Sequence, residues 1–257
     1  MVRAILHGCK GRMGRFITEM AAADDGIEIV AGVDVGEDPG LGYPFYNSVA
    51  EAAEEAAEEA DVVIDFSTAA AVDGLLDACA EKGLGVIVCT TGLSDAQLEH
   101  LAATTVRIPV LRSANMSLGV NLLMKILQPM AKTLAAAGFD IEIVEKHHNQ
   151  KLDAPSGTAI ALADSINEAM DGVYDYTFDR SQRRQKRDPK EIGFSAVRGG
   201  SIVGEHDVIF AGKDEVVTVS HTAFSRAIFA NGAITAAKFL AGKAPGFYTM
   251  EDVLKAD

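Results

Sequence analysis

The hydrophobic residues in the first half of the chain form short, continuous apolar runs separated by longer stretches with helical spacing. The apolar runs, all rich in valine, isoleucine or leucine, are Val2–His7, Ile27–Val33, Val62–Phe66, Gly85–Cys89 and Arg107–Leu111. The stretches with helical spacing are Arg12–Ala23, Ala70–Lys82 and Asp95–Thr104. Such alternation of apolar strands with helices is typical of a parallel sheet covered on both faces. The first half is therefore predicted to be an α/β domain.

The pattern changes in the second half of the chain. Its predicted elements are a helix at Leu118–Ala136, an alternating strand at Asp140–His148, a helix at Ser156–Met170, three strands at Ile192–Val197, Ser201–Ala211 and Glu215–Thr222, and a helix at Ser225–Leu240. Pro129 predicts a kink in the long helix. Glycine-containing turns separate the three strands and predict an antiparallel meander. A parallel α/β half followed by a largely antiparallel sheet predicts two domains.

A long polar segment, Asp171–Lys190, interrupts the second half and concentrates positive charge. Its basic residues are Arg180, Arg183, Arg184, Lys186, Arg187 and Lys190. Loops of this length are commonly lids or binding loops. One hypothesis is that this segment closes over a doubly negative ligand.

The composition, 48% hydrophobic and 23% charged over 257 residues, is that of a globular protein and excludes disorder. The 37 acidic and 23 basic residues give a net charge of −14, so no nucleic-acid partner is expected. Three cysteines, Cys9, Cys79 and Cys89, without a Cys-x-x-Cys pair indicate free thiols in a reducing compartment. No uncharged apolar run is long enough for a membrane span, and Ala4–Leu6 is too short for a signal segment. A cytoplasmic protein without a membrane partner is expected.

A glycine-rich turn follows the first predicted strand and opens the first predicted helix. It reads Gly8-Cys9-Lys10-Gly11-Arg12-Met13-Gly14, a G-x-x-G-x-x-G variant of the dinucleotide-binding fingerprint. Gly8, Gly11 and Gly14 can supply the tight turn and the close backbone approach to a pyrophosphate at a helix N-terminus. Asp34 ends the second strand, where a carboxylate accepts the hydroxyls of the adenosine ribose. The alternative is a glycine-rich turn that binds no ligand.

The residue after Asp34 is Val35, which cannot pair with a 2′-phosphate, and Asp34 would repel one. NADH is therefore predicted over NADPH, although Lys10 and Arg12 could partly compensate and leave NADPH open. Two further loops follow strands at the same predicted sheet edge, where ligands of open parallel sheets bind. They are Cys89-Thr90-Thr91-Gly92 and Ser113-Ala114-Asn115-Met116. Both are candidates for the ribose and nicotinamide site, and ordinary turn chemistry is the alternative.

The segment Glu145–Ala159 combines two histidines, two lysines and a Pro-Ser-Gly-Thr helix start. Adjacent strand residues His147 and His148 point to opposite faces, and no metal-ligand spacing is present, so no metal site is predicted. A catalytic serine triad is conceivable, but Ser156 lacks a G-x-S-x-G context and is more simply a helix cap.

The same segment suits the capture of an anion beside a proton donor. The backbone N–H groups of Ser156, Gly157 and Thr158 can hold a carboxylate at the helix N-terminus. Lys151 adds positive charge, and a histidine titrates near neutral pH. The alternative is that both histidines are ordinary strand-end polar residues.

These motifs together resemble the dihydrodipicolinate reductase family over essentially the whole chain. The resemblance is carried by the glycine turn, Thr90-Thr91-Gly92, the H-H-x-x-K-x-D-A-P-S-G-T run within Glu145–Ala159, Arg198–His206 and Phe229–Ala233. The resemblance implies a Rossmann-like dinucleotide-binding domain of residues 1–117 and 228–257. It implies a mixed α/β domain of residues 118–227 that binds the substrate and builds a homotetramer.

The resemblance also implies residue roles. His147 and Lys151 would be the acid–base residues, and the substrate carboxylates would bind to His148, Gly157 and Thr158. The cofactor would contact Gly8, Cys9, Lys10, Gly11, Arg12, Met13, Asp34, Cys89, Thr90, Thr91, Ser113, Ala114, Asn115 and Met116. Cys9 stands where the family often has alanine, and Val35 where some members carry arginine.

We therefore expect an NAD(P)H-dependent reductase of a small cyclic dicarboxylate, 4-hydroxy-tetrahydrodipicolinate, in the diaminopimelate route to lysine. In this hypothesis His147 donates the proton, and Lys151 contributes positive charge. Two alternatives stay open. One is a related Rossmann dehydrogenase of another amino-dicarboxylate, and the other is a non-catalytic dinucleotide sensor, which would have no need of an acid beside a carboxylate site.

Overall fold

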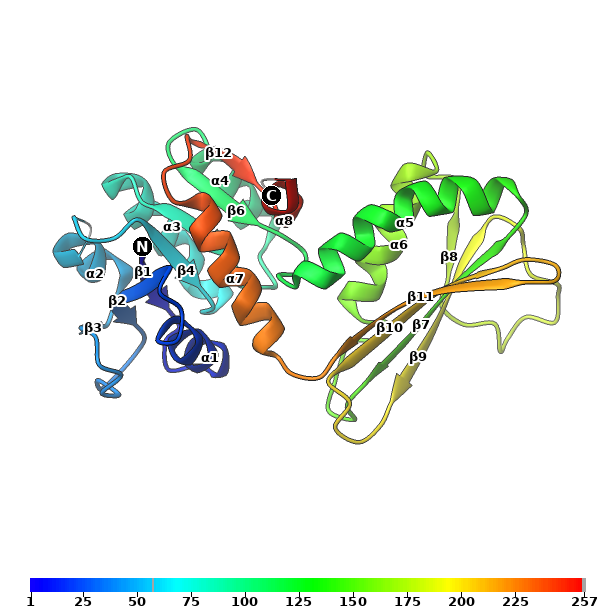
Figure 1. The fold of residues 1–257 in the computed structure, drawn as a ribbon, viewed down its shortest axis with the longest axis horizontal. Helices are drawn as coiled ribbons and strands as arrows, with labels where there is room; N and C mark the ends of the chain where they lie inside the picture. Colours follow the sequence, from blue (N-terminus) through cyan, green and yellow to red (C-terminus); the bar gives the residue numbers. More distant parts are fainter. Residues whose placement is uncertain (57, 256–257) are drawn as a thin grey trace. The chain divides into compact units, whose positions relative to one another are not determined.

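The computed structural model describes residues 1–56 and 58–255, which divide into two compact units (Figure 1). The first unit contains Met1–Ser117 and the C-terminal segment from Ala227, and the second contains Leu118–Arg226. The predicted domain boundaries lie within one residue of these. Among the described residues, none of the helices has the length and apolar character needed to cross a membrane.

The first unit is a seven-stranded parallel sheet in the order β12-β6-β5-β4-β1-β2-β3. Its strands are β1 (Val2–His7), β2 (Ile27–Val33), β3 (Phe45–Tyr46), β4 (Val62–Asp65), β5 (Gly85–Val88), β6 (Pro109–Arg112) and β12 (Gly246–Tyr248). The central strands are almost fully buried, as their continuous apolar runs predict. The predicted Rossmann-like parallel sheet is confirmed.

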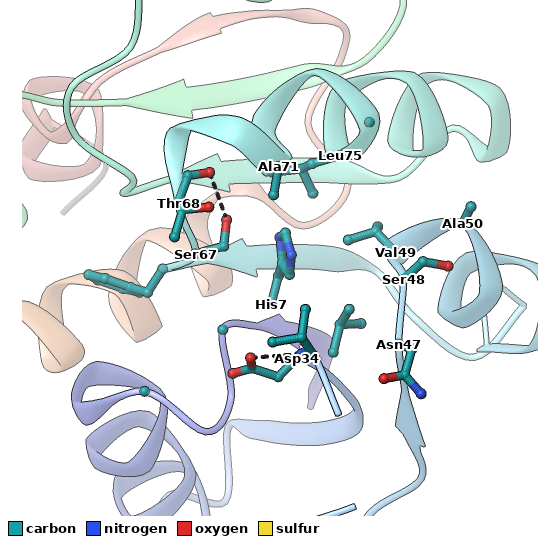
Figure 2. A pocket seen from close by; sticks show the side chains of 16 residues that line it. His7, Asp34, Asn47, Ser48, Val49, Ala50, Ser67, Thr68, Ala71 and Leu75 are labelled. Carbon is teal, nitrogen blue, oxygen red and sulfur yellow. Dashed lines mark hydrogen bonds between the residues drawn. The ribbon is translucent and has the colours of Figure 1, made fainter. Parts of the chain in front are cut away.

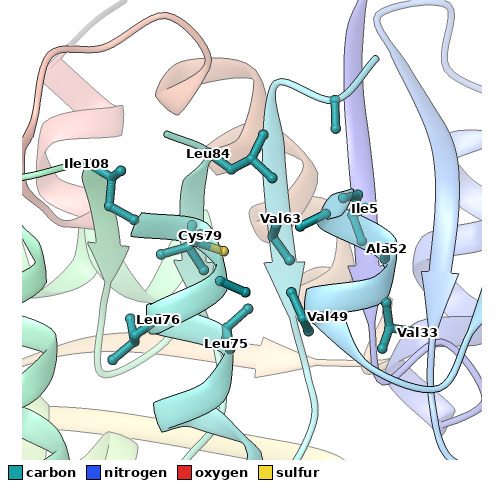
Figure 3. Packing of buried hydrophobic residues seen from close by; sticks show 14 of the residues in the cluster. Ile5, Val33, Val49, Ala52, Val63, Leu75, Leu76, Cys79, Leu84 and Ile108 are labelled. Carbon is teal, nitrogen blue, oxygen red and sulfur yellow. The ribbon is translucent and has the colours of Figure 1, made fainter. Parts of the chain in front are cut away.

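Helices cover the sheet of the first unit. They are α1 (Arg12–Ala21), α2 (Val49–Ala56), α3 (Val72–Lys82, preceded by a 3-10 turn at Ala69–Ala71), α4 (Asp95–Thr104), α7 (Ala227–Leu240) and α8 (Met250–Lys255). Side chains of α2 and α3 pack on the sheet around Ile5 and Val63 (Figure 3). Helix α7 packs against α1 and against β4, β5 and β6. Residues at the helix ends explain where two of these helices stop and start. Helix α3 ends at Gly83, which has a φ of 73°, and Ser94 with Gln97 forms a capping box at the start of α4.

The second unit is a five-stranded mixed sheet with two helices packed against one face. Its elements are α5 (Leu118–Ala136), β7 (Asp140–His147), α6 (Gly157–Ala169), β8 (Asp175–Thr177), β9 (Glu191–Arg198), β10 (Gly204–Ala211) and β11 (Val216–Ala223). Buried residues alternate along β7 and β10, and their inward side chains form a core with α5 and α6. Pro129 lies inside α5.

The predicted meander is wrong at its first step. The sheet order is β11-β10-β7-β9-β8, so β7 lies between β9 and β10 and pairs parallel with β9 and antiparallel with β10. Only β10 and β11 form the expected hairpin. The turn signal after β9 indicates a reversal of direction, but a five-residue connection is long enough to cross one intervening strand.

Candidate active site

The glycine turn connects β1 to α1 with the geometry that the motif predicts. Gly8 has a φ of 84°, its N–H donates to the Val33 carbonyl at 2.8 Å, and a Cβ there would lie 2.5 Å from the Phe66 carbonyl oxygen. A Cβ on Gly14 would overlap the Gly8 carbonyl. Both positions therefore require glycine. Gly11, directly before α1, brings no side chain to the start of that helix, which leaves its N-terminus suited to a phosphate.

Asp34 is held beside this turn by two backbone donors. The Lys10 N–H donates to Oδ2 at 2.9 Å and the Val35 N–H to Oδ1 at 2.8 Å. The Lys10 ammonium group donates to the carbonyls of Val35 and Glu37 at 2.8 and 3.0 Å. Asp34 is therefore oriented, and its remaining lone pairs are available to ribose hydroxyls.

A cavity of about 640 Å³ lies at the carboxyl ends of β1, β2 and β4 (Figure 2). Its lining residues are His7, Gly8, Gly11, Val33, Asp34, Val35, Asn47, Ser48, Val49, Ala50, Phe66, Ser67, Thr68, Ala71, Gly74 and Leu75. A glycine turn, a helix N-terminus and an oriented carboxylate in one cavity fit the pyrophosphate and ribose of a dinucleotide.

Only three of the predicted cofactor residues line this cavity: Gly8, Gly11 and Asp34. Cys9 is fully buried, and burial raises the pKa of its thiol to about 11. Its side chain is therefore part of the core. Lys10 lines a smaller neighbouring hollow. Arg12 and Met13 form the first turn of α1.

The other two predicted loops lie at the ends of β5 and β6, on the same sheet edge. The Cys89 N–H donates to the Asp65 carbonyl at 2.9 Å, and burial raises the pKa of the Cys89 thiol. Thr90 is buried, and its hydroxyl has no hydrogen-bond partner among the described residues, whereas Thr91 is exposed. The loop Ser113-Ala114-Asn115-Met116 packs against α7, where Gly232 leaves room for the Met116 carbonyl.

Sequence reasoning missed part of this site. Ser67 and Thr68 follow β4, and His7 ends β1 with its Nδ1 2.9 Å from Oδ1 of the fully buried Asp65. The Ser67 hydroxyl donates to the same carboxylate oxygen at 2.6 Å. The signal was available, because Val62–Phe66 was predicted as a strand of the same parallel sheet and its carboxyl end had to reach the same edge.

The second unit contains a buried network centred on Glu145. His147 Nδ1 donates to Glu145 Oε2 at 2.6 Å, and Arg198 donates to both carboxylate oxygens at 2.7 Å. The Ser156 N–H donates to Oε1 at 3.0 Å. Glu145 is completely buried, so its charge is compensated by this bidentate arginine and two further donors.

This network sets the protonation behaviour of His147. Burial alone would raise the pKa of Glu145, but the hydrogen bonds from Arg198, His147 and Ser156 together hold it below its usual value. Burial lowers the pKa of His147, the charges of Lys151 and Arg198 act in the same direction, and the Glu145 hydrogen bond and charge offset this only in part. Because Nδ1 holds its proton against Glu145, Nε2 is the ring nitrogen that can gain and lose one.

The helix N-terminus beside His147 differs from the prediction in one respect. Ser156 directly precedes α6, but its hydroxyl makes no capping bond and its N–H is taken by Glu145. The interpretation of Ser156 as a side-chain cap is therefore wrong. Its N–H is also not available to a substrate carboxylate, because it already binds Glu145. Gly157 and Thr158 begin α6 as expected.

Lys151 and His148 lie in the segment that leads to α6. Lys151 Nζ is 2.8 Å from Asp153 Oδ1, and the Lys151 N–H donates to the His148 carbonyl at 3.2 Å. The Asp153 side chain is 57% exposed, so an incoming carboxylate can compete for this lysine at small cost. A peptide bond in the cis form joins Ala154 and Pro155.

The basic segment is attached to the sheet of its own unit. Arg180 pairs bidentately with Glu142 and also contacts Glu191, Arg183 pairs with Glu191, and Arg187 pairs with Glu142 and Asp140. Acidic side chains of β7 and β9 therefore neutralise these three arginines, and closure of the segment over a doubly negative ligand stays a prediction. Within the described ranges, no group of histidine, cysteine and acidic side chains could hold a metal ion.

Comparison with known proteins gives full-length matches. Residues 2–116 match the family model "Dihydrodipicolinate reductase, N-terminus", and residues 119–254 match "Dihydrodipicolinate reductase, C-terminus". A protein of Caldanaerobacter subterraneus named 4-hydroxy-tetrahydrodipicolinate reductase is 50% identical over 99% of both chains. One of the same name from Clostridium tetani is 45% identical over 100% of this chain and 98% of its own.

Solved structures with the same fold are more distant in sequence. A dipicolinate-bound dihydrodipicolinate reductase from Paenisporosarcina sp. TG-14 superposes with a TM-score of 0.77 at 23% identity over 97% of both chains. An amine dehydrogenase from Mycobacterium smegmatis superposes with a TM-score of 0.66 at 13% identity, over 97% of this chain and 95% of its own. These likenesses concern the fold alone.

Proposed function

The chain belongs to the dihydrodipicolinate reductase family, and we propose that it reduces 4-hydroxy-tetrahydrodipicolinate to tetrahydrodipicolinate with NAD(P)H. This is the activity for which its curated relatives are named, and it lies in the diaminopimelate route to lysine. The observation that carries the proposal is the full-length family match together with the buried His147–Glu145–Arg198 network beside Lys151 and the start of α6. A non-catalytic sensor would have no use for an oriented acid at that place.

The overall reaction replaces the hydroxyl group of the substrate by hydrogen. One hydride and one proton are consumed, and one water and the oxidised cofactor are released. The reduced nicotinamide, when bound, supplies the hydride. The chain must therefore hold a dianionic ring, stabilise the negative charge that hydride brings and provide one proton per turnover.

His147 is the proposed proton donor: in its doubly protonated form it donates from Nε2, while Glu145 accepts the hydrogen bond from Nδ1. Lys151 is proposed to exchange Asp153 for a substrate carboxylate and to stabilise the developing charge. The carboxylates would also contact His148 and the N-terminal N–H groups at Gly157 and Thr158. The cofactor is proposed to lie over Gly8–Met13 and Asp34, with Cys89–Thr91 and Ser113–Met116 at its nicotinamide end.

The activity is tested by mixing the purified chain with NADH and the product of the synthase that precedes this step, and following loss of the nicotinamide absorbance. Replacing His147 by Gln or Lys151 by Met should lower kcat about 10²- to 10⁴-fold, as loss of acid–base catalysis does, and leave NADH affinity unchanged. NADH binding without turnover by the unmodified chain would favour the sensor. Full turnover by both variants would reject the residue roles.

We further propose that NADH is preferred over NADPH, because Asp34 would face the 2′-phosphate. Asp34→Asn should raise kcat/KM for NADPH relative to NADH by about tenfold or more, since juxtaposed like charges cost several kcal/mol. Asp38→Asn, which removes a neighbouring exposed charge, is the matched control. A native preference for NADPH would contradict the proposal.

We also propose a cytoplasmic homotetramer assembled through the sheet of the second unit. Val197 on β9 and Val216 on β11 are exposed large apolar side chains, which an assembly would cover. Sedimentation of the purified chain should give the mass of four copies, and a monomer at working concentrations would contradict this proposal.

A further inference from the structure

Three histidines from three strands gather around the network of Glu145. In the β7–β10 ladder His206 stands opposite Glu145, and in the β10–β11 ladder it stands opposite His221. His147 lies two residues beyond Glu145 and shares its face of the sheet. The rings of His147 and His206 make an edge-to-face contact, with centroids 5.1 Å apart and planes at 73°. The three imidazoles therefore lie in a row, here called the file, on one face of the sheet across β7, β10 and β11.

The middle ring of this file is buried but polar. His206 is 4% exposed, and neither of its ring nitrogens has a hydrogen-bond partner among the described residues. A buried polar group without a partner costs about 1–3 kcal/mol. A phenylalanine would fill the same space without that cost, so packing against His147 does not account for an imidazole here.

The outer ring of the file leads toward the edge of the sheet. His221 is half-buried, and its Nδ1 is buried without a partner in the described part of the chain. It lies on β11, which ends the sheet order. Residues that stand opposite each other in an antiparallel pair have Cβ atoms about 4.5–5.5 Å apart, so one water molecule suffices to bridge their rings.

The inner ring is oriented so that its free nitrogen lies next to β10. Glu145 fixes His147 Nδ1, and His147 Nε2 would be 3.0 Å from a Cβ on Gly204, the first residue of β10. Only the missing side chain at Gly204 leaves this approach open. The nitrogen that gives up the catalytic proton thus lies beside the strand that carries His206.

We propose that His206 and His221 form, with bridging water, the path along which a proton returns to His147 Nε2 after each turnover. The proposal rests on the function proposed above, in which His147 is the donor and one proton is consumed per cycle. A water bonded to His221 donates a proton to one nitrogen of neutral His206. The N–H at its other nitrogen passes a proton through a second water to His147. The proton lost by His147 leaves with the substrate hydroxyl group as water, and the bulk solvent supplies the replacement.

Burial and the neighbouring charges keep His206 in the neutral form that this path needs. Burial, with His147 next in effect, lowers the pKa of His206 to about 4, although Glu145 acts in the opposite sense. His221 and Lys151 also disfavour a charge on this ring. His206 is therefore neutral at pH 7, with one nitrogen that accepts and one that donates, as a relay requires.

The test compares His206→Phe and His206→Gln with the unmodified chain in assays of NADH oxidation. Both variants should lower kcat about tenfold or more and leave the affinity for NADH unchanged. Proton return then limits turnover, so kcat should rise with the concentration of a small imidazole buffer and show a larger solvent deuterium isotope effect. In the unmodified chain kcat should not depend on buffer concentration. His221→Phe should produce a smaller loss with the same buffer dependence.

His100→Gln is the matched control, because His100 pairs with Asp73 on the surface of the other unit. It should change neither kcat nor its response to buffer. The proposal is overturned if either His206 variant keeps full kcat, or loses it without buffer rescue. These comparisons are made only if the unmodified chain turns over the substrate. If the unmodified chain shows no turnover, the proposed function itself is refuted. If His206→Phe does not fold, the glutamine variant decides alone.

Discussion

At the scale of single residues, the chemistry of the second unit depends on Glu145. Its carboxylate is completely buried and receives hydrogen bonds from Arg198, His147 and the Ser156 N–H. One residue therefore orients the proposed proton donor and also fixes the start of α6. A buried pair of this kind is valuable for orientation and contributes little net stability, because both charges are desolvated.

Glu145→Gln should lower the pKa of His147 below its value in the unmodified chain. Burial already depresses that pKa, and the Glu145 hydrogen bond and charge are what counteract it, so removing the charge leaves burial unopposed. The measurement is an NMR titration of labelled histidines, with His100 in the other unit as the resonance that should not move. An unchanged or raised pKa of His147 would contradict the interpretation that Glu145 raises this pKa.

At the scale of elements, the pattern of apolar residues predicts where strands occur, but it does not predict which strands pair in the sheet. The runs of the first half, such as Val2–His7 and Ile27–Val33, agree with β1 and β2 because a strand buried on both faces has few polar interruptions. No local feature of the sequence indicates that β7 lies between β9 and β10 in the sheet. The two-residue β3 and the three-residue β12 are too short for any periodicity.

The candidate site shows the same division between local and long-range information. The glycine turn and Asp34 were predictable because spacing along the chain determines them. Glu145 and His147 share a strand face by period two, yet the partnership of Glu145 with Arg198 requires the β7–β9 register. His206 and His221 lie some 60 residues or more from His147 along the chain, and only the ladders across β10 bring them close. The acidic partners of Arg180, Arg183 and Arg187 could not be predicted, because they lie on strands β7 and β9.

Gly204→Ala tests the fit between β10 and β7. The new Cβ would stand 3.0 Å from His147 Nε2, so the ring must shift or its nitrogen must be screened. We expect kcat to fall about tenfold or more, with the KM for NADH unchanged. Gly199→Ala, in the same connection but with no atom near its Cβ, is the control and should keep full activity. Equal activities for the two variants would remove the close approach from the mechanism.

At the scale of the whole molecule, the chain crosses from the first unit to the second at Leu118 and returns at Ala227. The second unit is one continuous segment with its own apolar core, which includes Leu127, Ile143, Leu162 and Phe210. It also contains every member of the network around Glu145. Residues 118–226 should therefore fold when expressed alone and should not bind NADH.

Acid should destabilise this fragment before its carboxylates titrate. The pKa values of His147, His206 and His221 are all lowered by burial, so between about pH 6.5 and pH 4 the unfolded fragment binds more protons than the folded one. Stability must then fall as pH falls, and His206 alone accounts for about 2 kcal/mol between pH 7 and pH 5. Urea unfolding followed by circular dichroism measures this, and His206→Phe should flatten the dependence. A fragment equally stable at pH 7 and pH 5 would show that His206 is not buried in neutral form.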